Sequence, residues 1–469
     1  MWLIKEDADT CQRGCYEQPV FDLLKGVLPV GGKTSSLTFA NNQHHVYFLY
    51  AVFILLYRVG ISVVSTWNPK ARKWKQGRKN VMEKVRQELA GNNAPIVWMH
   101  CASLGEFEQG RPLFERILQH YPLYKGIITF FSPSGFESTQ NYAVSSHTFY
   151  LPFGSEKICR EFVDMLNPSL VLWVKYEYWL YYLKHLYKKK IPTLLVSAHF
   201  RPDQPFFKWY GKVHRQMLHY FTYLFVQTES SRHLLETIGY GQKTILNGDT
   251  RFDRVLDIAK QFEPLPAIAA FCQDTRVIVA GSTWLEDEEE MEHYANTHPG
   301  ISFVIAPHEI HPDRLREMKV LFKNAILYSD YVKVQDPVQK TAVRKKYNTL
   351  IVDNIGMLSK LYHYATIAYV GGGFGEEGVH NILEAAVYGK PVIFGPVFNK
   401  YTEAIELLEE GGAITIETAL ELEKTFDLLI TDEKMYLERA KAAQNYVYSK
   451  DGATRRILSY IQANRLLTS

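Results

Sequence analysis

Short apolar runs recur along most of this chain, separated by longer segments of mixed polar and apolar residues. Uninterrupted apolar strands that alternate with helices are typical of a parallel β-sheet covered on both faces. The pattern breaks at the proline-containing segment 261–266 and then restarts. It predicts strands at 95–100, 126–131, 170–174, 193–196, 221–226 and 243–246, and after the break at 277–281, 302–305, 325–328, 349–352, 367–370 and 391–394.

Two series of strands predict an α/β protein with two doubly wound, Rossmann-like domains and a cleft between them. A chain of 469 residues is also too long for one ordinary hydrophobic core. We expect an N-terminal domain over 70–260 and a second domain over 270–448. A C-terminal helix is expected over 449–469, packing back toward the N-terminal domain.

A long apolar segment, 46–64, precedes the first domain. Its length is near the minimum for crossing a bilayer, while Arg58 would be costly in the middle. We therefore predict a membrane anchor helix over 46–69, with everything downstream of it in the cytoplasm. Whether the helix spans the membrane or only embeds in it stays open. The alternative is a buried helix followed by a solvated basic face. Residues 1–45 lack periodicity and are expected to form a poorly ordered leader. The basic face comprises Lys70, Arg72, Lys73, Lys75, Arg78 and Lys79.

Composition narrows the chemistry further. Hydrophobic residues make up 46% and charged residues 22%, as in a globular protein, and the net charge of +3 is too small to suggest general nucleic-acid binding. The five cysteines and the histidines are dispersed, and no spacing suggests zinc. The sequence therefore predicts a reaction that needs neither a metal nor a cofactor.

A glycine-rich stretch, 371–378, follows the expected strand at 367–370 and precedes an expected helix over 379–387. This layout aims backbone N–H groups and the positive end of a helix dipole at one space, which suits an anion. Asn381 and Glu384 lie one helical turn apart and would share a face. We therefore expect a phosphate-bearing ligand here, although such loops can also serve only to turn the chain.

The first expected strand ends just before Glu106, where the carboxyl end of a strand places side chains near a ligand. A carboxylate there is a candidate general base for an acceptor hydroxyl. The alternative is that Glu106 only favours the N-terminus of the next helix. Other polar residues at strand ends are Glu177, His199, Arg201, Asp249, Arg251, Asp253, Ser282, Thr283, His308 and Arg314.

From about Tyr47 to the C-terminus, the chain resembles the 3-deoxy-D-manno-octulosonic acid (Kdo) transferases of lipopolysaccharide synthesis. The resemblance rests on ordered blocks at 100–106, 177–179, 197–201, 227–229, 248–253, 281–284, 306–314, 353–356, 371–384 and 395–399, and on Glu403. The resemblance implies a GT-B glycosyltransferase fold and an inverting transfer of Kdo from CMP-Kdo to the lipid A precursor, at the cytoplasmic face of the inner membrane. It places the catalytic base at Glu106, with Glu177 and Arg251 as groups that stabilise the transition state. The donor is expected at Ser282, Thr283, Pro307, His308, Ile355, Gly356, Met357, Gly372, Gly373, Asn381 and Glu384.

Two positions depart from the family pattern. Many members have Pro-Arg where this chain has Pro307 and His308, and Gly-Glu where it has Gly356 and Met357. The first change removes a permanent cation near the donor phosphate, for which Arg314 or Lys400 is a candidate replacement. Two rival functions remain, namely another membrane-associated GT-B nucleotide-sugar transferase, or an inactive, membrane-tethered nucleotide-binding protein.

Overall fold

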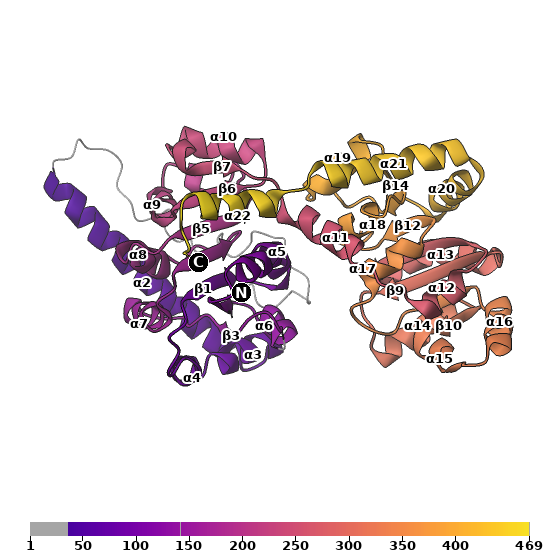
Figure 1. The fold of residues 1–469 in the computed structure, drawn as a ribbon, viewed down its shortest axis with the longest axis horizontal. Helices are drawn as coiled ribbons and strands as arrows, with labels where there is room; N and C mark the ends of the chain where they lie inside the picture. Colours follow the sequence, from indigo (N-terminus) through magenta and orange to yellow (C-terminus); the bar gives the residue numbers. More distant parts are fainter. Residues whose placement is uncertain (1–35, 141, 469) are drawn as a thin grey trace. The chain divides into compact units, whose positions relative to one another are not determined.

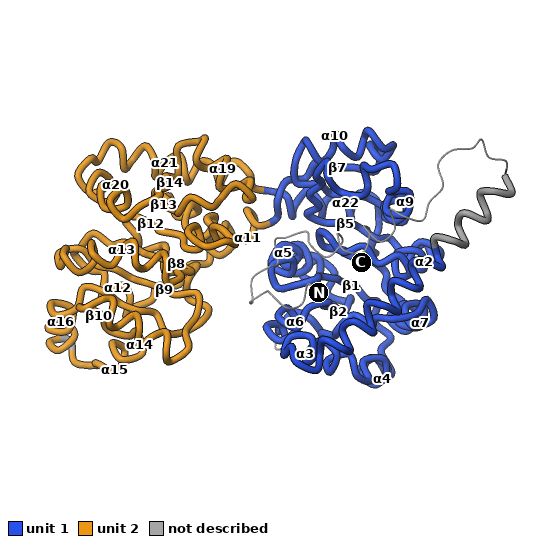
Figure 2. Tube along the Cα trace, turned by 180° about the vertical axis from the view of Figure 1, so that it is seen from behind, with its two compact units in different colours: residues 1–250, 452–469 blue, residues 251–451 orange. Residues whose placement is uncertain are grey.

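The computed structural model describes residues 36–140 and 142–468, and it divides into two compact units. Unit 1 takes residues 1–250 and 452–469, and unit 2 takes residues 251–451 (Figure 2). Each unit contains one seven-stranded sheet in which every paired strand is parallel. The predicted fold class, two doubly wound α/β units, is confirmed.

The sheet of unit 1 has the strand order β3-β2-β1-β4-β5-β6-β7. Its strands are β1 Ile96–Cys101, β2 Lys125–Phe130, β3 His147–Tyr150, β4 Leu170–Val174, β5 Thr193–Ala198, β6 Tyr223–Val226 and β7 Thr244–Leu246. Its helices are α2 Ser36–Val64, α3 Pro69–Gly77, α4 Val81–Glu88, α5 Leu104–His120, α6 Pro133–Thr139, α7 Glu156–Leu166, α8 Leu180–Lys188, α9 Lys212–Tyr220, α10 Glu229–Thr237 and α22 Ala453–Ala463, with short 3₁₀ turns η1 Pro205–Phe207 and η2 Gly241–Lys243.

The sheet of unit 2 has the strand order β10-β11-β9-β8-β12-β13-β14. Its strands are β8 Arg276–Thr283, β9 Ile301–Pro307, β10 Ala325–Leu327, β11 Thr349–Ile351, β12 Ile367–Val370, β13 Val392–Phe394 and β14 Ala413–Thr415. Its helices are α11 Thr250–Lys260, α12 Pro266–Cys272, α13 Leu285–Thr297, α14 Pro312–Leu321, α15 Tyr328–Lys333, α16 Pro337–Lys346, α17 Leu358–Leu361, α18 Leu383–Ala386, α19 Thr402–Glu409, α20 Ala419–Thr431 and α21 Glu433–Ser449, with one 3₁₀ turn η3 Tyr362–Tyr364.

The chain passes from unit 1 to unit 2 at the start of α11, before the expected boundary at 260. The apolar residues Phe252, Val255 and Leu256 of this helix are buried in the core of unit 2. The chain returns to unit 1 for α22, whose Ile457 and Ile461 are fully buried in the same cluster as strand residues of β1 and β4 (Figure 1).

Helix α2 begins at Ser36, inside the segment expected to be a leader, and residues 1–35 lie outside the described part of the chain. From Tyr47 onward one face of α2 packs on unit 1. Ile54 and Ile61 are 5% and 3% exposed, and the ring of Tyr50 lies 4.8 Å from that of Tyr181 on α8. This packing runs along the helix and leaves the opposite apolar face uncovered.

Candidate active-site residues

Glu106 lies in the first turn of α5, directly after β1, and it is 3% exposed. The backbone N–H of Ala102 donates a hydrogen bond to its carboxylate, so the side chain also closes the helix N-terminus. Burial, and then the charge of Glu177, raise the pKa of Glu106 to about 8, while the Ala102 N–H and Lys175 oppose that rise. A carboxyl with such a pKa is a strong base once it is ionised.

Glu177 follows β4, which pairs directly with β1, so both carboxyls lie at the same edge of the sheet. Oε2 of Glu177 lies 2.8 Å from Nε2 of His100 and accepts a 3.0 Å hydrogen bond from Nε1 of Trp179. Burial raises the pKa of Glu177 to about 8, opposed by the Trp179 N–H and the Arg78 cation. The structure thus brings together Glu106 and Glu177, the two unit 1 residues for which the sequence predicted a catalytic role.

Arg78 belongs to this group as well, although the sequence placed it on the basic face after the apolar segment. Its guanidinium stacks 3.8 Å from the ring of Trp74 and donates to the carbonyl oxygens of Leu151 and Phe131. Burial lowers the pKa of Arg78 to about 9, so it stays cationic at neutral pH. Arg78 therefore turns inward, unlike what was expected of a residue in the basic segment after the apolar helix.

Arg251 opens α11 in unit 2 and forms an ion pair with Glu403 of α19, at 2.6 Å between Nη1 and Oε1. Both side chains are largely buried, at 16% and 8% exposure. Glu403 therefore fixes the guanidinium in one orientation.

The glycine-rich stretch after β12 differs from the expected strand–loop–helix layout. The helix expected over 379–387 is only one turn, α18, which begins at Leu383 and not directly after Gly378. The N–H of Gly372 is already donated to Asp287, at 2.8 Å. A Cβ on Gly373 would lie 2.5 Å from the backbone of Gly395. These glycines are needed for close backbone packing. The prediction of a longer helix whose dipole is aimed at the loop is wrong.

The remaining donor-site candidates of unit 2 lie mostly at the carboxyl edge of its sheet. Ser282 and Thr283 end β8, and His308 follows β9, its neighbour. The hydroxyl of Thr283 turns inward to Glu288, at 2.7 Å, whereas Asn381 donates to Glu384 at 3.0 Å. In the loop after β11, Ile355 is 87% exposed, Gly356 has a φ of 93° and the sulfur of Met357 accepts from Asn354.

His308 takes part in a group of three near-parallel rings. It stacks on Trp284 at 4.5 Å and on His380 at 4.9 Å between ring centroids, while Nε1 of Trp284 donates to Nε2 of His380. The two cations considered as substitutes for an arginine are engaged elsewhere. Arg314 pairs with Glu288 and Glu317, and Lys400 donates to the carbonyl of Glu376.

Within residues 36–140 and 142–468, no group of three or more His, Cys, Asp or Glu side chains is arranged to hold a metal ion.

Comparison with known proteins shows which family the chain resembles. The family described as 3-Deoxy-D-manno-octulosonic-acid transferase (kdotransferase) matches residues 73–254, which include Glu106, Glu177 and Arg251. A 3-deoxy-D-manno-octulosonic acid transferase of Chlamydia trachomatis is 26% identical over 375 residues, covering 76% of this chain and 84% of its own. Over three quarters of its length, the chain is thus similar to Kdo transferases. Another such transferase, from Haemophilus influenzae, is 25% identical over 78% of this chain and 86% of its own.

A further relative is a bifunctional glycosyltransferase/methyltransferase of Fusobacterium nucleatum, which is 26% identical and of whose length the chain covers only 52%. Solved structures support the fold alone. A putative UDP-N-acetylglucosamine 2-epimerase of Listeria monocytogenes has a TM-score of 0.55 at 16% identity, covering 80% of this chain and 98% of its own. UDP-GlcNAc 2-epimerase of Neisseria meningitidis has a TM-score of 0.54 at 18% identity, covering 78% and 100%. Both agree with the expected GT-B-like architecture.

The sequence missed three residues of the unit 1 group. His100 stood in a block that carried the resemblance but received no role, and a histidine inside an apolar strand was the available signal. Thr129, whose Oγ1 lies 2.9 Å from Nδ1 of His100, is likewise a polar residue inside an apolar strand, and this signal in the sequence is weaker. Nothing in the sequence distinguished Arg78 from its solvated basic neighbours.

Proposed function

We propose that this protein transfers Kdo from CMP-Kdo to a hydroxyl of the lipid A precursor, with inversion at the anomeric carbon. The match of residues 73–254 to the Kdo transferase family and the similarity to curated Kdo transferases support the donor and the reaction class. The observation that carries the proposal is Glu106, a buried carboxyl at the carboxyl end of β1 whose pKa is raised to about 8. A hydroxyl nucleophile needs a base of this strength.

The proposed step balances without a metal or a cofactor. Glu106 takes the proton of the acceptor hydroxyl as that oxygen bonds to the anomeric carbon of Kdo. The bond from this carbon to the phosphate oxygen breaks, and CMP leaves with the electron pair. Glu177 and Arg251 stabilise the charges of the transition state. Unit 2 binds the donor through its sheet edge, including Ser282 and His308.

We assign α2 to the membrane interface, where it embeds in one leaflet and does not span the bilayer. Its inner face packs on unit 1 along the helix, so that a spanning orientation would draw unit 1 into the lipid. Its outer face exposes Phe48, Leu55, Leu56, Val59 and Val63, each more than half exposed, and Trp67 follows. Residues 47–64 have a mean hydropathy of 1.9, and 11% of these residues are buried.

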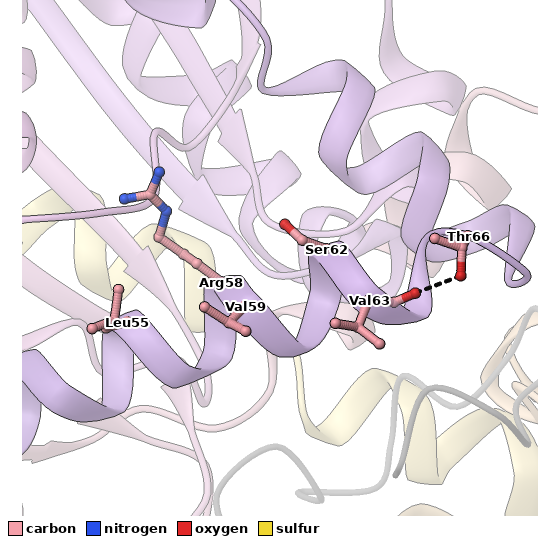
Figure 3. Close-up of a pocket in the computed structure, with 6 residues that line it drawn as sticks. All are labelled: Leu55, Arg58, Val59, Ser62, Val63 and Thr66. Atoms are coloured by element: carbon pink, nitrogen blue, oxygen red, sulfur yellow. Dashed lines mark hydrogen bonds between the residues drawn. The ribbon is translucent and has the colours of Figure 1, made fainter.

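An open depression lies on this outer face, lined by Leu55, Arg58, Val59, Ser62, Val63 and Thr66 (Figure 3). Arg58 can keep its charged group in the headgroup layer while its aliphatic stem follows the apolar face. The exposed lysines of α3 would then face anionic lipid on the cytoplasmic side, in a bacterial inner membrane.

Incubation of the full-length protein with CMP-Kdo and a tetraacylated, bis-phosphorylated lipid A precursor tests the reaction. Mass spectrometry should detect a gain of one or more Kdo units, and the count of additions follows from the same spectrum. Glu106→Gln should give no product while still binding CMP, because the amide keeps the hydrogen bond from Ala102 but cannot take a proton. No product from folded wild-type protein, or normal turnover by Glu106→Gln, would refute the proposal.

A further inference from the structure

Arg58 is the one charged residue between Tyr47 and Val64, the most apolar part of α2. Its side chain is exposed, and among the residues that the structure describes none forms a hydrogen bond or an ion pair with its guanidinium. A permanent cation in a segment that faces lipid is costly, so such residues mark functional sites. Arg58 therefore has a capacity for binding an anion that the described part of the protein does not use.

The guanidinium extends from α2 over the loop that follows β3. A Cβ added to Gly154 of this loop would lie 3.6 Å from Nη1 of Arg58. The next acidic side chain along the chain is engaged elsewhere, since Glu156 pairs with Lys184 at 3.0 Å. The cation therefore stays available beside the edge of unit 1 at which the strands end.

A hydroxyl and an apolar wall accompany this cation. Ser62 lies one helical turn after Arg58, and Figure 3 shows both side chains pointing to the same side of α2. Within the described ranges, the Ser62 hydroxyl has no hydrogen-bond partner. The depression that they line has a volume of about 550 Å³, and its apolar wall comes from Leu55, Val59 and Val63, each more than half exposed.

These groups fit one class of ligand. A guanidinium presents paired N–H donors that match phosphate oxygens, and a hydroxyl adds a further donor. A free phosphate ion would leave the apolar wall in water, whereas a phosphate-bearing lipid covers that wall with its acyl chains. The chemistry of the depression therefore suits the phosphate of a lipid.

Aromatic rings connect the depression with the candidate active site of unit 1. Tyr57 directly precedes Arg58, and its ring packs at 5.1 Å on that of Phe153. The Phe153 ring packs at 5.1 Å on Trp179, which donates to Glu177. A lipid whose phosphate is held at Arg58 is thus close to the carboxyls of unit 1, which favours the lipid acceptor over a bulk phospholipid.

We propose that Arg58, assisted by Ser62, binds one phosphate of the lipid acceptor and makes the enzyme selective for phosphorylated acceptors. The acyl chains of the acceptor lie along Leu55, Val59 and Val63. This inference rests on the proposed function for the identity of the acceptor. Selectivity for the phosphate is then set by the same helix that attaches unit 1 to the lipid surface.

Equilibrium binding of the full-length protein in nonionic detergent micelles tests the site without requiring turnover. The probes are the bis-phosphorylated lipid A precursor and its two monophosphorylated forms. In Arg58→Gln, the preference for the bis-phosphorylated form over one of the monophosphorylated forms should fall about ten-fold, the effect of losing one charge-assisted contact. Arg58→Lys should keep most of the preference, and Ser62→Ala should lower it about three-fold.

Lys75→Gln is the matched control, because Lys75 of α3 is exposed and its loss removes the same charge outside the depression. It should weaken the binding of all three lipids alike. An unchanged preference in Arg58→Gln, or no binding of any of the three lipids by the wild type, would overturn the inference.

Vesicles of phosphatidylglycerol and phosphatidylcholine separate the acceptor from bulk lipid as the source of the phosphate. Arg58→Gln and Lys75→Gln should weaken vesicle binding by the same small factor. A much larger loss in Arg58→Gln, together with an unchanged preference in micelles, would assign Arg58 to bulk phospholipid and overturn the inference. Absence of Kdo transfer by the wild type would refute the proposed function, while micelle binding would still decide whether Arg58 binds the phosphate.

Discussion

The ion pair between Glu288 of α13 and Arg314 of α14 offers a stringent test of what holds the candidate donor unit together. Nη2 of Arg314 bonds to Glu288, whose side chain is fully buried, while the Arg314 side chain is 10% exposed. The other carboxylate oxygen of Glu288 accepts from the hydroxyl of Thr283 at 2.7 Å. One carboxylate therefore fixes both the helix pair and the end of β8.

Glu288→Ala should destabilise unit 2 strongly, because it leaves a buried guanidinium without its main partner. Removing one member of a buried ion pair costs about 3–5 kcal/mol. Glu317 stays 3.3 Å from Nη1 of Arg314 but is 65% exposed, so its screened charge offsets only part of the loss. We therefore expect the free energy of unfolding of unit 2 to fall by about 3 kcal/mol. In a domain of this size, that loss lowers Tm by about 6–12 °C.

Calorimetry of the full-length protein measures this loss, and hydrogen exchange of peptides from β8, α13 and α14 locates it. The matched control is the double substitution Glu288→Leu with Arg314→Met, which removes both charges and should lie within about 1 kcal/mol of the wild type. A single variant as stable as the wild type would refute the reasoning. A double variant as unstable as the single one would show that lost packing, and not an uncompensated charge, is the cause.

Three further outcomes are expected from activity and binding measurements. The transfer rate of the wild type should rise about five-fold from pH 7 to pH 8. The reason is that the ionised fraction of Glu106, with a pKa of about 8, grows from about one tenth to one half. A flat pH–rate profile would exclude Glu106 as the base. Arg251→Met should lower kcat by about 100-fold and leave CMP bound, whereas loss of CMP binding would assign Arg251, held by Glu403, to the donor site. Leu55→Asp with Val59→Asp should release the protein from anionic lipid vesicles, while alanine at both positions retains binding; retention by the aspartate pair would refute the interfacial assignment of α2.

The fold was predictable because buried parallel strands are apolar on both faces, and this signal is local. All the expected strands are present, and β4 and β12 have the expected bounds. The two strands that the sequence missed, β3 and β14, are both edge strands. Each is short and only partly buried, so it needs few apolar residues and leaves little pattern.

The glycine-rich stretch shows why a loop motif can mislead about the structure that follows it. The glycines were interpreted as forming an anion site before a helix. In the structure, Gly372 and Gly378 adopt positive φ. A Cβ added to Gly378 would lie 2.7 Å from the carbonyl oxygen of Val397. That need arises from packing against a distant strand end. Sequence spacing carries no information about such an approach, so the one-turn helix could not be predicted.

The candidate base was predictable from its position, whereas its environment was not. Glu106 follows an apolar strand in the sequence, but Glu177 and Lys175, which affect its proton affinity, follow β4, and Arg78, which affects that of Glu177, lies in the turn after α3. Arg78 illustrates the difficulty, since lysines with the same local composition stay in solvent. Only the packing of Trp74 and Phe131 around its guanidinium distinguishes it.

The two interpretations of Glu106, helix cap and general base, are compatible in this structure. As a cap, the carboxyl accepts the N–H of Ala102, and this bond anchors the side chain at the end of β1. As a base, it needs a high proton affinity, which burial and the nearby Glu177 supply against the pull of that same N–H. A solvent-exposed cap would lack this affinity, and a buried base without the cap would lack a fixed direction. In the proposed mechanism, the chemistry therefore depends on placing one capping carboxyl under the cover of the unit 1 core, beside the carboxyl of Glu177.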